Sequence, residues 1–94
     1  MIVTIRSATD GSVITASTIA IKATNIDTGE TETKTLTVPH LGVLKFDNPT
    51  LLCEGSNVRL EVDSSTPGFV ESQTQIYYRI DKRFEEVDFF VSTV

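Results

Sequence analysis

The sequence has few of the residues that carry catalysis or hold metal ions. It contains no Trp, one His (His40), one Cys (Cys53) and one Met. A zinc site needs three or four His, Cys or carboxylate ligands, and nucleophilic catalysis needs a base that a third group orients. A single histidine in the turn-like segment 39–42 supplies neither arrangement. We therefore expect no enzyme activity, no catalytic or metal-binding residue and no cofactor.

Positive charge is scarce as well. Lys and Arg number 8 against 13 Asp and Glu, so the formal net charge is -5 at pH 7. Proteins that bind nucleic acid neutralise phosphates with clustered basic residues, and this chain has no such cluster. No apolar run reaches the ~18–20 residues that a membrane span requires, and the first residues lack the pattern of a signal peptide. We expect a soluble protein that neither binds nucleic acid nor inserts into a membrane.

What the chain does have is β-branched residues, and these favour strands. It contains 14 Thr, 10 Val and 8 Ile, about a third of its length. Such side chains are stiff at χ1 and pack well on a pleated surface. No stretch of the chain shows a convincing helical period of apolar residues. Its five glycines are spread one per turn, so they predict turns and not a phosphate-binding loop.

Alternating apolar and polar residues, interrupted by turn residues, predict the strands. We expect them at 2–6, 17–24, 31–38, 43–46, 58–62, 76–80 and 87–91. Strands without helices favour two packed sheets, because a single wide sheet would leave one face uncovered. The sequence thus predicts an all-β fold: a single seven-stranded antiparallel Greek-key β-sandwich, immunoglobulin-like or prealbumin-like, with residues 1–94 as one domain.

Two segments have a more specific expected place in the sandwich. The strand at 31–38 carries Thr at every odd position from 31 to 37, and such a polar strand suits a sheet edge, where Lys34 would discourage pairing with a second chain. In the long break after residue 46, Leu51 and Leu52 are expected to fill one end of the core.

The order of turns and core residues resembles carboxypeptidase regulatory-like domains, which share a transthyretin-like (prealbumin-like) sandwich. The opening segment 9–21 is similar to the start of these domains, and Asn25 with Thr28-Gly29 follows as it often does there. The other matching elements are Gly42 to Phe46, Leu52 with Gly55, Val58-Leu60-Val62 and Pro67-Gly68-Phe69. The resemblance covers roughly residues 9 to 80 and implies a fold more than a function.

A related sandwich, the collagen-adhesin B-type repeat, can crosslink its first strand to its last. That chemistry joins a Lys to an Asn with a Glu as proton shuttle. The matching positions here hold Ile5 or Arg6 in place of the Lys, Val62 in place of the Glu, and Asp88 where an Asn is needed. An internal isopeptide bond is therefore not expected.

Acidic residues are expected to gather at one end of the sandwich. Successive connections of an antiparallel sandwich alternate between its ends, so the turns at 25–30, 47–56 and 81–86 should lie together. Calcium takes six to eight oxygen ligands, which leaves a calcium-stabilised spacer open as an alternative. A solvated acidic end is the simpler interpretation. The residues concerned are Asp27, Glu30, Asp47, Glu54, Asp81, Glu85 and Glu86.

The best functional indication is aromatic. If Ile76, Tyr78 and Ile80 point inward, Tyr77 points outward, and by the same alternation Phe90 points outward. We expect Tyr77 and Phe90 to lie side by side because their strands are neighbours in the sequence, with Phe84 extending the patch. Exposed aromatic residues in one patch are typical of binding surfaces.

We therefore predict a structural or protein-interaction module, an accessory domain of a virion or cell-surface assembly. Its partner would be another protein or a second copy of the chain, and it would contact the last two strands or the Thr-rich edge. A chain that starts with Met and lacks a signal peptide favours a virion component, although an excised domain fits as well. The alternative from another class is a carbohydrate- or ligand-binding module, which the absence of Trp weakens.

Overall fold

The computed structural model describes residues 1–63, 75–81 and 86–92. The strands in these ranges are β1 (Ile2–Ser7), β2 (Ile19–Asn25), β3 (Thr31–Leu36), β4 (Val43–Lys45), β5 (Asn57–Val62), β6 (Gln75–Arg79) and β7 (Glu86–Val91). Their ends differ from the predicted ones by no more than two residues. The described part of the chain is all-β, as predicted. It contains no helix that is long and apolar enough to cross a membrane.

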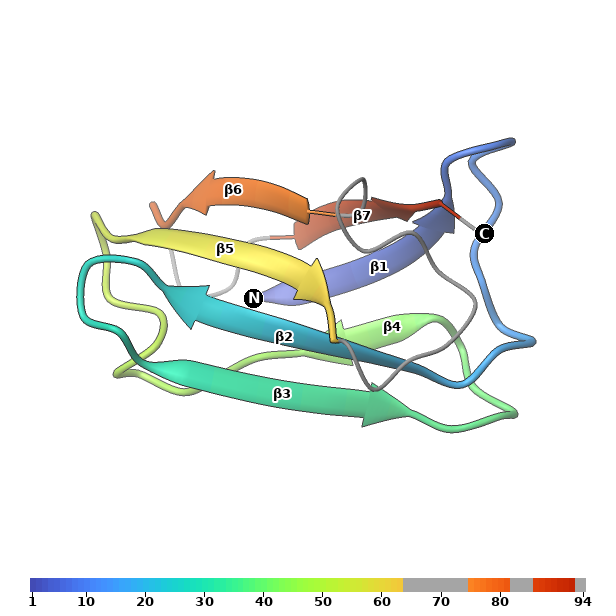
Figure 1. Cartoon of the computed structure of the whole chain (residues 1–94), viewed down its shortest axis with the longest axis horizontal. Helices are drawn as coiled ribbons and strands as arrows, with labels where there is room; N and C mark the ends of the chain where they lie inside the picture. The colour runs from blue at the N-terminus through green and yellow to red at the C-terminus, as the bar shows by residue number, and fades with distance from the viewer. Residues whose placement is uncertain (64–74, 82–85, 93–94) are drawn as a thin grey trace.

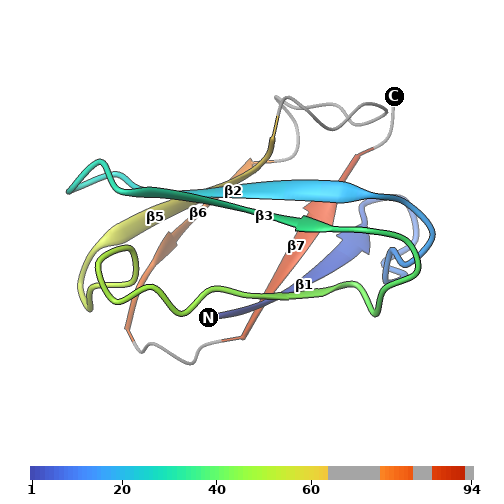
Figure 2. The same cartoon turned by 90° about the horizontal axis from the view of Figure 1, so that it is seen from below.

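The strands form two sheets that pack as a β-sandwich. One sheet has three strands in the order β4-β1-β7, and the other has four in the order β3-β2-β5-β6 (Figure 1). Seen from below, the sheets are two layers, with β2 and β3 in one and β1 and β7 in the other (Figure 2). The chain therefore changes sheet between β1 and β2, on either side of β4, and between β6 and β7. β3 lies at an edge, which confirms the prediction for the Thr-rich strand.

Two parts of the fold prediction are wrong. The sandwich is not wholly antiparallel, because β1 and β7 pair in parallel from Ile2↔Glu86 to Ser7↔Val91. A hairpin joins only antiparallel strands, and these two strands are separated by most of the chain. The order also departs from the immunoglobulin sandwich, in which the first and second strands share a sheet. Here β1 and β2 lie in different sheets.

The core lies between the sheets and takes alternate residues from β1, β2, β5 and β7. Among the described residues, Phe46 and Phe89 are the largest fully buried side chains. Leu51 and Leu52 are buried as well, which confirms that they fill the core. The remaining buried members come from both sheets: Met1, Val3, Ile5, Ile19, Ile21, Ala23, Leu44, Val58, Leu60, Val62, Ile80, Val87 and Val91.

Asn25, at the end of β2, is the polar residue buried within the described core. Its side-chain amide donates to the carbonyl of Leu51 at 2.9 Å. Its side-chain oxygen accepts the backbone N–H groups of Asp27 and Thr28 at 3.0 and 3.1 Å. Buried polar groups that are fully hydrogen-bonded stabilise a structure, whereas unpaired ones cost free energy. Asn25 therefore fixes the β2–β3 turn and attaches it to the core-filling Leu51.

The β3–β4 connection packs closely against the β1–β2 connection at the other end of the sandwich. Gly42 has φ +76°, and a Cβ placed on it would clash with Cγ1 of Val13 and lie 2.9 Å from the carbonyl oxygen of Ile14. Its own carbonyl accepts the N–H of Ile5 at 2.8 Å. The backbone of residue 42 thus sits against β1 in a space that only glycine fits.

We predict that Gly42→Ala destabilises the protein far more than the matched change Gly29→Ala. Gly29 has a similar φ of +82°, but a Cβ added there would meet nothing within 4 Å. A left-handed alanine costs about 1–2 kcal/mol, and crowding adds about 1–3 kcal/mol at Gly42 alone. Urea unfolding of the two variants measures the difference. Equal losses of stability would contradict the close packing of residue 42.

Candidate interaction surface

The outer side of the three-stranded sheet gathers the predicted contact residue Phe90 with a set of half-exposed neighbours. Val3, Ile5, Leu44, Val87 and Phe89 point into the core. The residues between them therefore point away from it, because side chains alternate along a strand. We call this surface the β4–β1–β7 face. It consists of Ile2, Thr4 and Arg6 on β1, Val43 and Lys45 on β4, and Glu86, Asp88 and Phe90 on β7.

Phe90 and Val43 are the large apolar side chains exposed on this face. Phe90 is 46% exposed and Val43 is 43% exposed. Phe90 pairs with Arg6, and Thr4 pairs with Val43 on one side and Asp88 on the other. The outward orientation predicted for Phe90 is confirmed. Phe90 lies on a strand whose alternate residues are anchored in the core, so the backbone that carries the ring is held in place.

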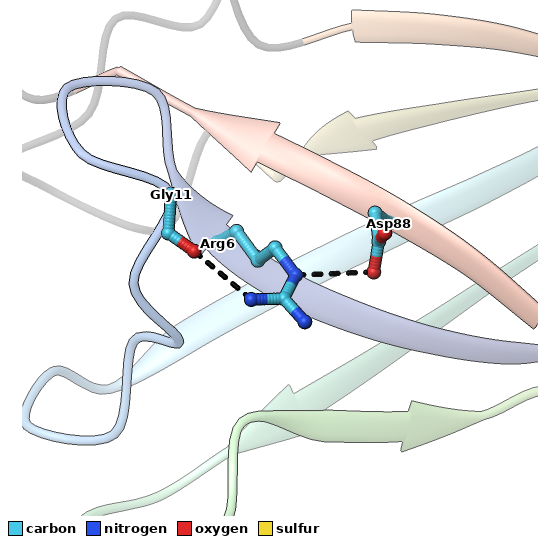
Figure 3. Close-up of polar contacts among 3 residues, drawn as sticks. All are labelled: Arg6, Gly11 and Asp88. Atoms are coloured by element: carbon cyan, nitrogen blue, oxygen red, sulfur yellow. Dashed lines mark hydrogen bonds and ion pairs between the residues drawn. The ribbon is translucent and has the colours of Figure 1, made fainter.

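Arg6 connects the strands of this face to a neighbouring turn. Its Nε donates to Oδ1 of Asp88 on β7 at 3.2 Å, and one of its terminal NH groups donates to the carbonyl of Gly11 at 2.9 Å (Figure 3). Both side chains of the ion pair are partly exposed. Such a pair contributes only about 0–1 kcal/mol to stability. Its main effect is to hold the guanidinium along the sheet and to give the Asp88 carboxylate a counter-charge within the chain.

The predicted patch of Tyr77 beside Phe90 does not form. Tyr77 lies on β6 in the four-stranded sheet, opposite Arg59, whereas Phe90 lies on β7 in the three-stranded sheet. The two strands follow each other in sequence, but the chain changes sheet between them. Outward residues of β6 and β7 therefore belong to opposite faces of the sandwich. Phe84, the third predicted contact residue, lies outside the described residues, as does the Pro67-Gly68-Phe69 turn.

The second predicted contact region, the Thr-rich edge, has the expected alternation. Thr31, Thr33 and Thr35 are exposed. Glu32 and Lys34 lie on the core side of the edge strand and approach each other to 3.6 Å. Charges that point inward at an edge discourage a second strand from adding there. This edge is therefore a poorer docking site than the β4–β1–β7 face.

His40 has a structural role in the β3–β4 connection. Its Nε2 lies 2.7 Å from the carbonyl oxygen of Ser17, and its Nδ1 accepts the N–H of Gly42 at 2.9 Å. A carbonyl oxygen only accepts, so Nε2 carries the proton. Both ring nitrogens are occupied by backbone groups, and the ring joins the two connections at this end of the sandwich.

The described parts of the acidic turns lie together at the opposite end, and the Asp27 carboxylate is bonded to the backbone there. Oδ2 of Asp27 accepts the N–H of Asn57 at 2.8 Å. The N–H of Gly55 donates to the carbonyl of Ile80 at 2.7 Å, which brings the turns at 47–56 and 80–81 together. Within the described ranges no three His, Cys, Asp or Glu side chains are placed to hold one metal ion. Glu85 is outside these ranges.

Sequence reasoning missed the exposed apolar residues of the β3–β4 connection. Val38 is 50% exposed and Leu41 is 86% exposed. The predicted strand at 31–38 includes Val38, on the side opposite the threonines, but β3 ends at Leu36. The Pro39 that follows Val38 was the signal for an earlier end, because proline has no N–H to donate to a strand ladder.

Comparisons of the chain with protein-family models, with curated proteins and with solved structures find no match. Its function must therefore be argued from its own residues.

Asp10, in the β1–β2 connection, offers a test of the local geometry. The side-chain hydroxyl of Ser12 donates to Oδ1 of Asp10 at 2.6 Å, and the backbone N–H of Ser12 donates to the same atom at 2.9 Å. These bonds, the hydroxyl first, lower the pKa of Asp10 because they favour the charged carboxylate. Their contribution to stability is present above the pKa of the unfolded chain and is lost as the pH falls through the lowered folded pKa.

We predict that Ser12→Ala raises the pKa of Asp10 part of the way to its ordinary value. The hydroxyl bond is removed, whereas the backbone bond remains. NMR titration of the Asp10 carboxyl carbon measures the shift, with Thr9→Ala as the neighbouring control. An unchanged titration in Ser12→Ala would show that the hydroxyl does not bond this carboxylate in solution.

Proposed function

We propose that this chain is a non-catalytic β-sandwich module that acts by binding another protein through its β4–β1–β7 face. The observation that carries the proposal is the exposure of Phe90, 46%, on a strand whose neighbours Phe89 and Val91 are buried. Aromatic side chains are enriched at the centres of protein interfaces. A strand that is already held in place loses little backbone conformational entropy when it binds.

The composition of the face supports the same function. It mixes two exposed apolar side chains, Val43 and Phe90, with charged residues of both signs. An apolar centre with a polar surround is the usual anatomy of an interface that forms between separately stable proteins. The face is also built entirely on strands, which position side chains more rigidly than loops do.

The sequence predicts either an immunoglobulin-like or a prealbumin-like sandwich, and of these two we propose the prealbumin-like fold. The first two strands lie in different sheets, which argues against the immunoglobulin order. The resemblance of segments 9–21 and 42–62 to carboxypeptidase regulatory-like domains supports this choice. Such sandwiches often serve as accessory modules, so we infer a place in a virion or cell-surface assembly.

Other classes of function have less support. A carbohydrate platform would need neighbouring exposed aromatic rings, and the strands of Tyr77 and Phe90 belong to different sheets. A base at His40 would need a free ring nitrogen, and both are bonded to backbone groups. A calcium-stabilised spacer predicts that a chelator lowers the melting temperature, which a thermal scan tests directly.

We predict that Phe90→Ser abolishes protein binding while leaving the fold intact. The matched control is Ile26→Ser, because Ile26 is 47% exposed but lies on the β2–β3 turn, away from the face. Each serine variant should lose about 1 kcal/mol or less of stability, since neither side chain is in the core.

The measurement compares three immobilised proteins, wild type and the two variants, for capture of the soluble wild-type chain and of proteins from the source extract. We expect the wild type and Ile26→Ser to retain the same partner, and Phe90→Ser to lose it. Retention by all three proteins, or by none, would contradict the proposed function.

A further inference from the structure

The strand registers place a base, an apolar residue and an acid in one row across the β4–β1–β7 face. Ile2 pairs with Lys45 on β4 and with Glu86 on β7. Neighbouring strands are about 4.8 Å apart, so Lys45 and Glu86 flank Ile2 at about 10 Å from each other. The two charges are thus held on opposite edges of the same sheet, at the same level along β1.

These two charges differ from the other pair on this face. Arg6 and Asp88 neutralise each other at 3.2 Å. Lys45 and Glu86 have no ion-pair partner among the described residues. Within the described part of the chain, the face therefore presents one unpaired positive charge at its β4 edge and one unpaired negative charge at its β7 edge.

At the other end of the face the registers place apolar residues on both edges. Arg6 pairs with Phe90 on the β7 side, and an isolated bridge pairs Arg6 with Val13 on the β4 side. Opposite residues in a ladder share a face, so Val13 and Phe90 flank the Arg6 stem. The face thus has complementary charges at one level of β1 and apolar groups at another.

Resting on the proposed function, we propose that the partner of this face is the same face of a second copy, related by a two-fold axis parallel to β1. This axis exchanges the β4 and β7 edges. Lys45 of each copy then meets Glu86 of the other, and Phe90 of each meets Val13 of the other. A two-fold interface must be self-complementary in this way, and sheets that pack face to face keep their strands within about 30° of each other.

The alternative in-plane axis, perpendicular to β1, has no such complementarity. It exchanges the two ends of the face, so Glu86 would meet Phe90, Lys45 would meet Val13 and Ile2 would meet Arg6. Each contact would bury a charge against an apolar group, which costs free energy. In the chosen arrangement the two Arg6 residues face each other, and Asp88 of each copy meets Val43 of the other. The Arg6 and Asp88 charges are already paired with each other within each copy.

Charge reversals test the proposal, because they predict a rescue that no other arrangement requires. Lys45→Glu and Glu86→Lys should each weaken dimerisation about tenfold or more, since each variant turns two attractive contacts into repulsive ones. An equimolar mixture of the two variants should form a heterodimer, because every contact between positions 45 and 86 would again join an acid to a base. The double variant, which carries both reversals in one chain, should also regain dimerisation.

The matched control is Glu54→Lys, which makes the same change of charge on an exposed turn away from the face. Sedimentation equilibrium at low salt, over a wide concentration range, gives the dimer constants. Circular dichroism checks that every variant is folded. We expect a dimer for the wild type and Glu54→Lys, weak association for the single reversals, and rescue in the mixture.

Three results would overturn the second-copy proposal, and the first two would do so without overturning the proposed function. The first is a wild type that stays monomeric at every concentration while Phe90→Ser still loses a captured partner from the extract. The second is a dimer that Phe90→Ser dissolves but that neither charge reversal affects, which would mean that the face self-associates in a different orientation. Loss of dimerisation in the mixture as well as in the single variants would also overturn it.

Discussion

The parallel ladder between β1 and β7 is the contact on which the rest of the structure depends. It joins the first and last strands through six consecutive residue pairs, from Ile2↔Glu86 to Ser7↔Val91. Without it, the three-residue strand β4 would be the one described strand left to pair with β1. Phe89, one of the largest buried side chains, enters the core from β7. The ladder thus completes both the smaller sheet and the core beneath it.

The same ladder creates the surface to which we assign function. Because the pairing is in register, Phe90 lies beside Arg6 and Asp88 lies beside Thr4, so Asp88 is within reach of the Arg6 guanidinium. A shift by one residue would turn Phe90 into the core and Phe89 outward. The burial of Phe89 therefore fixes the register, and the register fixes the pattern of charges and apolar groups on the outside.

Much of the fold could be predicted from the sequence, because alternation is a local signal. The strands, the edge position of the Thr-rich segment, the burial of Leu51 and Leu52 and the exposure of Phe90 all follow from residues close together in the chain. The parallel pairing and the separation of Tyr77 from Phe90 could not be predicted in this way. They depend on where the chain changes sheet, and a turn such as 81–86 has the same composition whether it closes a hairpin or crosses to the other layer.

The site prediction was limited for the same reason. Alternation tells which side chains point outward, but it does not tell which outward side chains share a face. Val43, Lys45 and Glu86 become neighbours of one surface only through the pairing of β1 with both β4 and β7. The charges available to a partner on this surface could be recognised only after Arg6 was seen to neutralise Asp88.

The most direct test of the account is an NMR dilution series that follows the backbone amide shifts of the whole chain. We expect concentration-dependent shifts in β1, β4 and β7 and constant shifts in β2, β3 and β5, because only the β4–β1–β7 face meets a second copy. Shifts that stay constant throughout, or that change in the four-stranded sheet instead, would contradict the assignment of this face as the surface of self-association.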